Sequence, residues 1–300
     1  MTTTQPIPAH DLPAPSQAGA IRESVSRAYA DAVTRGSSCC GTQTACGPTA
    51  EKAESIGYSA AELASVPSEA TGTTFGCGNP TALTEIAPGD VVLDLGSGAG
   101  LDLILAARRV GPTGRVIGVD MTDEMIERAR KNVAAAGLSN VEIRKGIIEE
   151  LPVETGSVDW IISNCVLNLS PEKPRVFAEV ARVLKPGGRM LVSDIVAEEM
   201  PDWAKQSISL YVSCLSGAIA EADYLGGLRA AGLADVEVRD RFVYDAESLL
   251  GFAADAEDEL MKLFAEMGLP QTRETALALA RQLEGKIASV RVFGRKPLAS

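Results

Sequence analysis

Short apolar runs alternate with amphipathic stretches through the middle of the chain. Each run is five to eight residues long, too short for a stable helix and typical of a strand that is buried on both faces. The stretches between the runs repeat apolar residues at helical spacing, and the stretch at 171–188 is expected to end as a helix at Pro186 and Gly187. Strands that alternate with helices in this way predict a parallel sheet with helices on both faces. The five runs are residues 91–95, 114–120, 141–148, 158–164 and 189–196.

The segment that precedes these runs is expected to contain two helices. Residues 19–35 repeat Ile21, Val25, Ala28 and Ala32 at helical spacing. Farther on, Ser59 followed by Glu62 has the form of a helix-capping box, which predicts a short helix over 59–65.

The segment that follows the fifth run adds two helices and two strands. Helices are expected over 202–220 and 221–232. Alternating apolar and polar residues predict strands over 236–244 and 287–296. The residues between these strands, 246–284, are expected to be helical and to form a small lid or satellite region.

These elements predict an α/β, Rossmann-like fold: a mostly parallel seven-stranded sheet with helices on both faces, an N-terminal cysteine-bearing segment and a small helical C-terminal insertion. The expected organisation is a flexible leader over 1–18, a segment with a cysteine loop over 19–78, a core over 79–225, and a region over 226–300 that completes the sheet and carries the insertion 246–284.

Composition and charge narrow the class of protein. With 300 residues, 46% of them hydrophobic, the chain can bury a full core. No apolar run approaches the ~18 residues needed to cross a bilayer, and the polar, proline-rich start does not resemble a secretory signal, so we expect a cytoplasmic protein. The formal net charge of −12 disfavours nucleic acid and anionic membranes as partners.

The chain has six cysteines and a single histidine, His10, which lies in the proline-rich leader. A Ser-His-Asp triad or a histidine-rich metal site is therefore not expected. In a cytosolic chain of this size the cysteines are expected as reduced thiols, metal or metalloid ligands or small buried side chains, not as a disulfide framework.

A glycine-rich turn, GSGAG, follows the first core strand and opens the next helix. Its glycines, Gly96, Gly98 and Gly100, let the backbone turn tightly and approach a ligand closely. Asp120 ends the second strand, where a carboxylate can accept hydrogen bonds from ribose hydroxyls. The carboxylate of Asp94, just before the turn, would repel a pyrophosphate but suits a ligand with an ammonium and a sulfonium group, which points to S-adenosylmethionine.

The motifs DLGSGAG, GVDM, KGIIEELP and VLKPGG, in this order over about 80–200, resemble those of class I S-adenosylmethionine-dependent methyltransferases. The resemblance implies that the glycine-rich turn faces the methionine part, that Asp120 and Met121 hold the ribose and adenine, and that Asn164 closes the edge at the fourth strand. The cofactor residues that we predict are Asp94, Gly96, Ser97, Gly98, Gly100, Asp120, Met121, Ile148, Glu149 and Asn164.

The cysteines supply the candidate acceptor chemistry. Cys165 comes directly after the fourth strand, so it is expected to face the reactive methyl group at the carboxyl edge of the sheet. Cys77 lies between two glycines, which are expected to keep its thiol accessible, and Cys214 falls on the helix predicted over 202–220. Burial in the core remains the alternative for Cys165 and, taken alone, for Cys214.

The segments around Cys77, Cys165 and Cys214 (FGCGNP, SNCVLNLS and YVSCLSGA) are similar to those of arsenite S-adenosylmethionine methyltransferases, and the match runs from about 36 to 225. This resemblance implies that the three cysteines bind arsenic(III) and that one cysteine of the 39–46 loop takes part. Cys40 is preferred there, with Cys39 next and Cys46 the third candidate.

The chemistry that the resemblance implies needs no general base. Soft thiolates bind arsenic(III), whose lone pair carries no proton and attacks the sulfonium methyl group. Arsenite or a thiol-conjugated arsenic is the expected substrate. In the redox version of the reaction two cysteines form a disulfide, which a thioredoxin-like protein or a small thiol reduces.

Three other interpretations stay open. A methyltransferase of a small organic acceptor, such as a quinone, sterol or amine, would share the whole cofactor site. A non-catalytic protein that sequesters a thiophilic metal or metalloid would bind arsenic without producing S-adenosylhomocysteine. Zinc storage in the cysteine loop is disfavoured, because paired cysteine spacing and histidines are missing from it.

Overall fold

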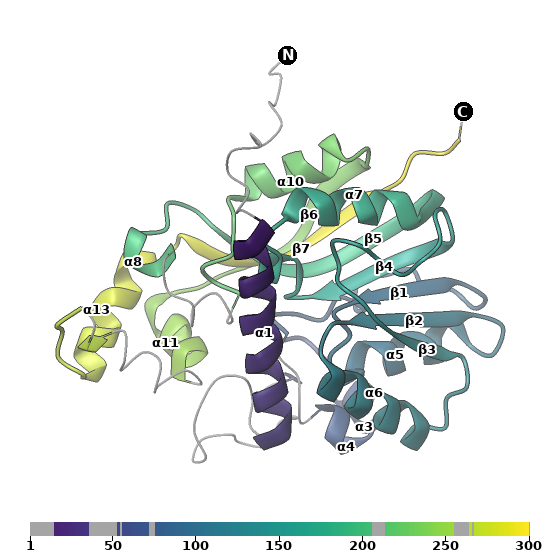
Figure 1. Cartoon of the computed structure of the whole chain (residues 1–300), viewed down its shortest axis with the longest axis horizontal. Helices are drawn as coiled ribbons and strands as arrows, with labels where there is room; N and C mark the ends of the chain where they lie inside the picture. Colours follow the sequence, from purple (N-terminus) through teal and green to yellow (C-terminus); the bar gives the residue numbers. More distant parts are fainter. Residues whose placement is uncertain are drawn as a thin grey trace.

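The computed structural model describes residues 15–35, 53–54, 56–71, 76–205, 214–254, 264–265 and 267–299. Its centre is a seven-stranded sheet in the order β3-β2-β1-β4-β5-β7-β6 (Figure 1). Neighbouring strands from β3 to β5 are parallel, whereas β7 runs antiparallel to both β5 and β6. The predicted fold class is therefore confirmed. The strands are β1 Val91–Leu95, β2 Arg115–Asp120, β3 Val141–Lys145, β4 Val158–Asn164, β5 Leu184–Ala197, β6 Ala234–Val243 and β7 Ile287–Arg295.

Helices cover both faces of the sheet, because the central strands are apolar on both sides. Figure 1 shows α5 (Leu101–Val110) and α6 (Asp123–Ala135) on one face and α7 (Lys173–Val183) and α10 (Glu221–Ala230) on the other. Two short helices, α3 (Ala60–Ala64) and α4 (Ser68–Thr71), precede the sheet.

The predicted elements before and within the core are largely confirmed. The capping box of α3 is present, with Ser59 and Glu62 bonded to each other's backbone as predicted. Helix α1 (Pro15–Arg35) begins four residues earlier than the predicted 19–35 helix, at a proline, which is favoured in the first turn of a helix.

The predicted end of the helix at 171–188 is wrong. Helix α7 ends at Val183, and β5 begins at once with Leu184, which pairs with Val158 of β4. Pro186 and Gly187 therefore lie inside the strand, beside a register shift between Val158 and Trp160. Such a bulge admits residues that a regular strand excludes, so the sequence signal was a strand irregularity and not a helix end.

The helix predicted over 202–220 is confirmed at its start by α8 (Asp202–Lys205), and its part over 206–213 lies outside the described residues. Residues 214–220 form turns and extended chain, and Cys214 has φ of +65°, which no right-handed helix contains. Cys214 therefore lies in a turn and not on a helix. No helix in the described parts of the chain is long and apolar enough to cross a membrane.

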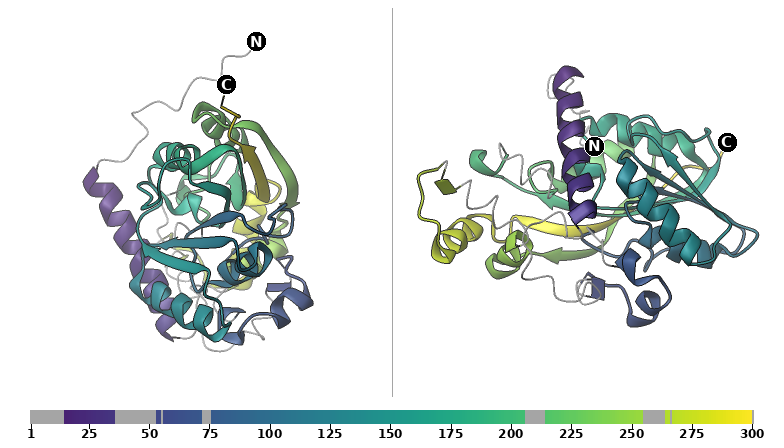
Figure 2. Two further views of the ribbon diagram at one scale, coloured as in Figure 1. Left: turned by 90° about the vertical axis from the view of Figure 1, so that its right-hand side faces the viewer. Right: turned by 60° about the horizontal axis from the view of Figure 1, so that its bottom comes forward.

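The predicted insertion 246–284 contains α11 (Ala246–Ala254) and α13 (Arg273–Leu283), which contact each other. Figures 1 and 2 show these two helices beside α8, away from β2 and β3. Buried residues of both helices, including Leu249 and Leu283, belong to the same apolar cluster as Cys77, Cys165 and Cys214. The two helices therefore pack into the same apolar cluster as the cysteines.

Candidate active site

The glycine-rich turn joins β1 to α5 and forms one wall of a cavity. Gly96, Gly98 and Gly100 all have positive φ, which only glycine adopts readily. A Cβ on Gly96 would stand 2.5 Å from the side chain of Val166, so a methyl group cannot be added there without moving its neighbours. The backbone amide of Gly96 donates to the carbonyl of Val119 (2.8 Å), which fixes the turn against β2.

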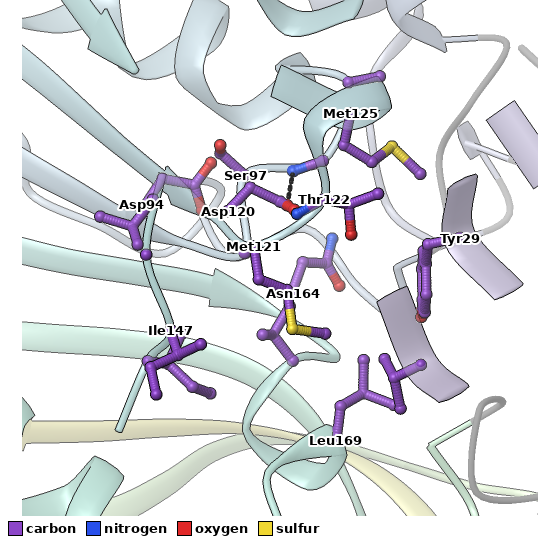
Figure 3. A pocket seen from close by; sticks show the side chains of 18 of the residues that line it. Tyr29, Asp94, Ser97, Asp120, Met121, Thr122, Met125, Ile147, Asn164 and Leu169 are labelled. Atoms are coloured by element: carbon purple, nitrogen blue, oxygen red, sulfur yellow. Dashed lines mark hydrogen bonds between the residues drawn. The ribbon is translucent and has the colours of Figure 1, made fainter. Parts of the chain in front are cut away.

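The cavity opens at the carboxyl ends of β1, β2 and β4 (Figure 3). This is the position at which open parallel sheets bind ligands. All ten predicted cofactor residues line it: Asp94, Gly96, Ser97, Gly98, Gly100, Asp120, Met121, Ile148, Glu149 and Asn164. Their roles toward a cofactor stay predictions, whereas their meeting at one cavity is a feature of the fold.

Three carboxylates surround the cavity at the glycine-rich turn. Burial raises the pKa of Asp94 well above its ordinary value, and the charges of Asp102 and Asp120 add to the shift. Burial also raises the pKa of Asp102 to about 6, against the hydrogen bond from Tyr58, and it raises the pKa of Asp120. Burial and mutual repulsion therefore disfavour the ionised carboxylates, and a cationic ligand in the cavity would relieve this repulsion.

Asp120 combines a structural role with capacity for a ligand. Its carboxylate accepts hydrogen bonds from the backbone amides of Gly98 and Thr122, both at 2.9 Å. Each carboxylate oxygen can accept a further bond, so hydroxyl groups of a ligand can still be bound. The same side chain therefore holds the glycine-rich turn and faces the cavity.

Helix α1 closes the other side of the cavity, which sequence reasoning did not predict. Figures 1 and 2 show it across the ends of the strands, and Figure 3 shows Tyr29 opposite Asp120. Its Arg22 donates from Nε to Glu149 (3.1 Å) and forms a second ion pair with Glu172. The helical spacing identified the helix, but no local signal indicated the partner of its arginine.

A second set of residues that sequence reasoning missed links Tyr58 and Asp102 to the cavity wall. The Tyr58 hydroxyl donates to the Asp102 carboxylate at 2.8 Å, and both side chains are buried. The signal for Asp102 was present, because it is a carboxylate in the first turn of an otherwise apolar helix segment, LDLILAA.

Cys77 and Cys165 form a disulfide, with their Cα atoms 5.9 Å apart, although they are 88 residues apart in the sequence. Both are buried, with exposed fractions of 7% and 3%. The expectations of reduced thiols here and of an accessible Cys77 thiol are therefore wrong for this structure. The flanking glycines have another use, since Cβ atoms on Gly76 and Gly78 would overlap the side chains of Asn164 and Ser193.

Cys214 lies against this pair. Its thiol donates to the backbone carbonyl of Cys165 at 2.8 Å, and the residue is 3% exposed. Its positive φ, and that of Cys165 at +59°, belong to a region that non-glycine residues rarely adopt. Both cysteines therefore occupy an uncommon backbone conformation, which the surrounding structure must stabilise.

The remaining predicted ligands, Cys39, Cys40 and Cys46, lie outside the described residues, as does His10. In the part of the chain that is described, no three His, Cys, Asp or Glu side chains form a group able to hold a metal ion. In the disulfide, Cys77 and Cys165 have no free thiols. The predicted arsenic(III) site at Cys77, Cys165 and Cys214 therefore requires that the disulfide be reduced first.

The chain is similar in sequence to known methyltransferases. The methyltransferase domain family matches residues 86–268. The arsenite methyltransferase of Halobacterium salinarum is 46% identical over 228 residues, 72% of this chain and 58% of that protein. The arsenite methyltransferase of Aquipseudomonas alcaligenes is 40% identical over 58% of this chain and 52% of that protein. The chain thus spans little more than half the length of these two relatives.

Among solved structures, an arsenic(III) S-adenosylmethionine methyltransferase from Chlamydomonas reinhardtii superimposes with a TM-score of 0.62. It is 31% identical in sequence, and the match covers 84% of this chain and 75% of that chain.

Proposed function

The chain belongs to the arsenite methyltransferase family of S-adenosylmethionine-dependent methyltransferases, and from this premise we propose that it methylates trivalent arsenic held by its own cysteine thiolates. The observation that carries the proposal is the position of the cysteines. Cys165 stands between Asn164 and Val166, which both line the cofactor cavity, and Cys77 and Cys214 contact Cys165. An acceptor bound there lies next to the methyl donor.

The cavity fits S-adenosylmethionine by its charge and by its shape. The three carboxylates Asp94, Asp102 and Asp120 suit the ammonium and sulfonium groups, and the positive-φ glycines of the turn give the cavity a wall of bare backbone that a ligand can approach closely. When bound, S-adenosylmethionine supplies a methyl group on a positively charged sulfur. We assign the methionine part to the turn at Asp94–Gly100, the ribose to Asp120 and the adenine to Met121, Ile148 and Glu149.

The role of the cysteines is to bind and orient the substrate. Thiolates are soft ligands and select arsenic(III) over oxygen-preferring ions. Three sulfur ligands leave the lone pair of arsenic unshared, and this lone pair carries no proton, so the protein needs no general base. Cys165 and Cys214 are each 3% exposed, so bulk water would be kept from their thiolates.

The disulfide supports a redox step in the cycle. Methylation oxidises trivalent arsenic by two electrons, and two thiols that become a disulfide return those electrons. Cys77 and Cys165 are the pair that we propose for this step. A dithiol reductant, such as a thioredoxin-like protein, or a small thiol would then regenerate the two thiols, which fits a cytoplasmic enzyme.

The test is to incubate the protein with arsenite, a thiol and S-adenosylmethionine, and to measure arsenic species and S-adenosylhomocysteine together. Methylated arsenicals that accumulate in step with S-adenosylhomocysteine are expected. Arsenite binding without S-adenosylhomocysteine would favour a sequestering protein. A cofactor that is consumed only when a quinone, sterol or amine is added would favour an organic acceptor.

A further inference from the structure

The side chain of Asn164 forms hydrogen bonds with the backbone of the loop that carries Cys77. Asn164 is the last residue of β4 and directly precedes Cys165. Its Oδ1 accepts hydrogen bonds from the backbone amides of Cys77 (2.9 Å) and Gly78 (3.3 Å), and its Nδ2 donates to the carbonyl of Gly78 (2.6 Å). One amide side chain thus joins two segments that are 87 residues apart in the sequence.

The remaining donor of this amide reaches a buried tyrosine. Nδ2 of Asn164 also donates to the hydroxyl of Tyr58 (3.0 Å), which in turn donates to Asp102 on the wall of the cavity. Both hydrogens and two lone pairs of the Asn164 amide are therefore engaged, which fixes its orientation. Tyr58 is 2% exposed, so this support lies away from water.

Glycines on both sides of Cys77 allow the loop to lie this close to Asn164 and its neighbours. A Cβ on Gly76 would come within 2.2 Å of the Asn164 amide, and a Cβ on Gly78 within 2.6 Å of Ser193 Oγ. Only one other side-chain bond to the Cys77 backbone is found among the described residues, from the Ser289 hydroxyl to the carbonyl of Cys77 (2.8 Å). Asn164 makes three bonds to the loop where Ser289 makes one.

We propose that Asn164 is a positioning residue that holds the Cys77 thiol beside Cys165 when the disulfide is reduced. Reduction removes the covalent link between β4 and the loop, and the hydrogen bonds of Asn164 remain to keep the two sulfurs close. Two thiols held near each other have a high effective concentration, both for forming a disulfide and for binding one arsenic atom together. The part of this inference that concerns arsenic rests on the proposed function, whereas the part that concerns the disulfide does not.

The first test measures the disulfide without any arsenic. The full-length protein is equilibrated in glutathione buffers, quenched in acid and alkylated, and the Cys77–Cys165 peptide is quantified by mass spectrometry. Each disulfide formed consumes two cysteine thiols and one oxidised glutathione and releases two reduced glutathiones. Asn164→Ala is expected to lower this equilibrium constant about tenfold, because the reduced loop gains freedom that closure must remove.

Two further variants separate positioning from general destabilisation. Asn140→Ala is the matched control, because the Asn140 amide also donates to two backbone carbonyls, those of Ala107 and Gly111, far along the chain from the cysteines. Asn164→Asp keeps the oxygen that accepts from Cys77 and Gly78, so it should fall between the wild type and Asn164→Ala. An Asn164→Ala value within twofold of the wild type, or an equal fall in Asn140→Ala, would overturn the proposal.

The second test measures arsenite binding to the reduced proteins by equilibrium dialysis. Asn164→Ala should raise the dissociation constant at least about tenfold, whereas Asn140→Ala should leave it unchanged. Arsenite binding within twofold of the wild type would contradict the proposal. If the glutathione equilibrium shifts while even the wild type fails to bind arsenite, the positioning role stands and the proposed function fails.

Discussion

The cofactor cavity and the cysteine cluster meet at β4, yet they are assembled by different means. The glycine-rich wall of the cavity takes its shape from a short stretch of chain, in which the Asp120 carboxylate and the Val119 carbonyl accept hydrogen bonds from amides of the turn about two dozen residues earlier. The cysteine cluster joins three segments whose cysteines are 88 and 49 residues apart, through side chains and through two non-glycine residues with positive φ. The glycine-rich wall of the cofactor cavity is thus encoded locally, whereas the geometry of the cysteine cluster depends on the tertiary fold.

The strongest test of this division removes one thiol. Cys165→Ser should reduce arsenite methylation at least about a hundredfold, because oxygen is a poor ligand for arsenic(III) and the serine replaces a central donor. S-adenosylmethionine affinity should stay within twofold, since Asn164 and Val166 line the cavity but Cys165 itself does not. Steady-state arsenic speciation and calorimetric cofactor binding measure the two effects. Normal turnover of the variant would remove the acceptor assignment.

The converse test removes a carboxylate of the cofactor cavity. Asp120→Ala should weaken S-adenosylmethionine binding by about 2–3 kcal/mol, because one or two charge-assisted hydrogen bonds are lost. Calorimetric titration measures the change, and reduced Asp120→Ala protein should still bind arsenite. The control is Asp123→Ala, whose exposed carboxylate is paired only with Lys145 among the described residues. A dissociation constant equal to that of the wild type would contradict the ribose assignment.

The same division explains what could be predicted from the sequence. The turn, Asp94 and Asp120 were predictable because strand, glycines and carboxylates are neighbours in the sequence. The gathering of Cys77, Cys165 and Cys214 was predictable only through resemblance, and the turn at Cys214 was mistaken for a helix because its apolar neighbours have helical spacing. The hydrogen bonds of Asn164 to the Cys77 loop and the ion pair of Arg22 with Glu149 could not be predicted, since each joins residues more than 80 positions apart.

A steric change in the loop should sharpen the comparison. Gly76→Ala places a Cβ 2.2 Å from the Asn164 amide, so the loop or the amide must move. We expect arsenite methylation to fall about tenfold, the effect of losing roughly 1.4 kcal/mol of alignment, with cofactor affinity unchanged. Gly19→Ala is the control, because nothing lies within 4 Å of the Cβ that it adds. Equal activities of the two variants would show that the loop tolerates displacement.

The carboxylates of the cavity predict a pH dependence of cofactor binding. Burial raises the pKa of Asp102 to about 6, so its charge, which attracts a cation, is present above pH 6 and is lost as the pH falls through that value. The dissociation constant of S-adenosylmethionine should therefore rise below pH 6, at most about tenfold per pH unit for a single proton. Asp102→Asn should flatten this part of the profile. A wild-type dissociation constant that is constant between pH 5 and 7 would contradict the expectation.

The smallest expected effect concerns helix α1, which lines the cofactor cavity although it is far in the sequence from the glycine-rich turn. Arg22 pairs with Glu149, whose side chain is 3% exposed, and with Glu172, so Arg22→Ala leaves a buried carboxylate with Ser170 as its remaining hydrogen-bond partner among the described residues. We expect cofactor affinity to fall about fivefold, the equivalent of roughly 1 kcal/mol. Arg27→Ala, on the same helix, removes only an exposed pair with Glu23 and should change nothing measurable.

The affinities of Arg22→Ala and Arg27→Ala for S-adenosylmethionine, compared with each other, decide whether α1 contributes to cofactor binding. If Arg22→Ala and Arg27→Ala bind S-adenosylmethionine equally well, then α1 only covers a site that strands β1, β2 and β4 already complete. If Arg22→Ala alone weakens binding, a long-range ion pair contributes to the cofactor site as Asn164 is proposed to contribute to the cysteine cluster. The two regions would then differ in the number of such long-range contacts and not in kind.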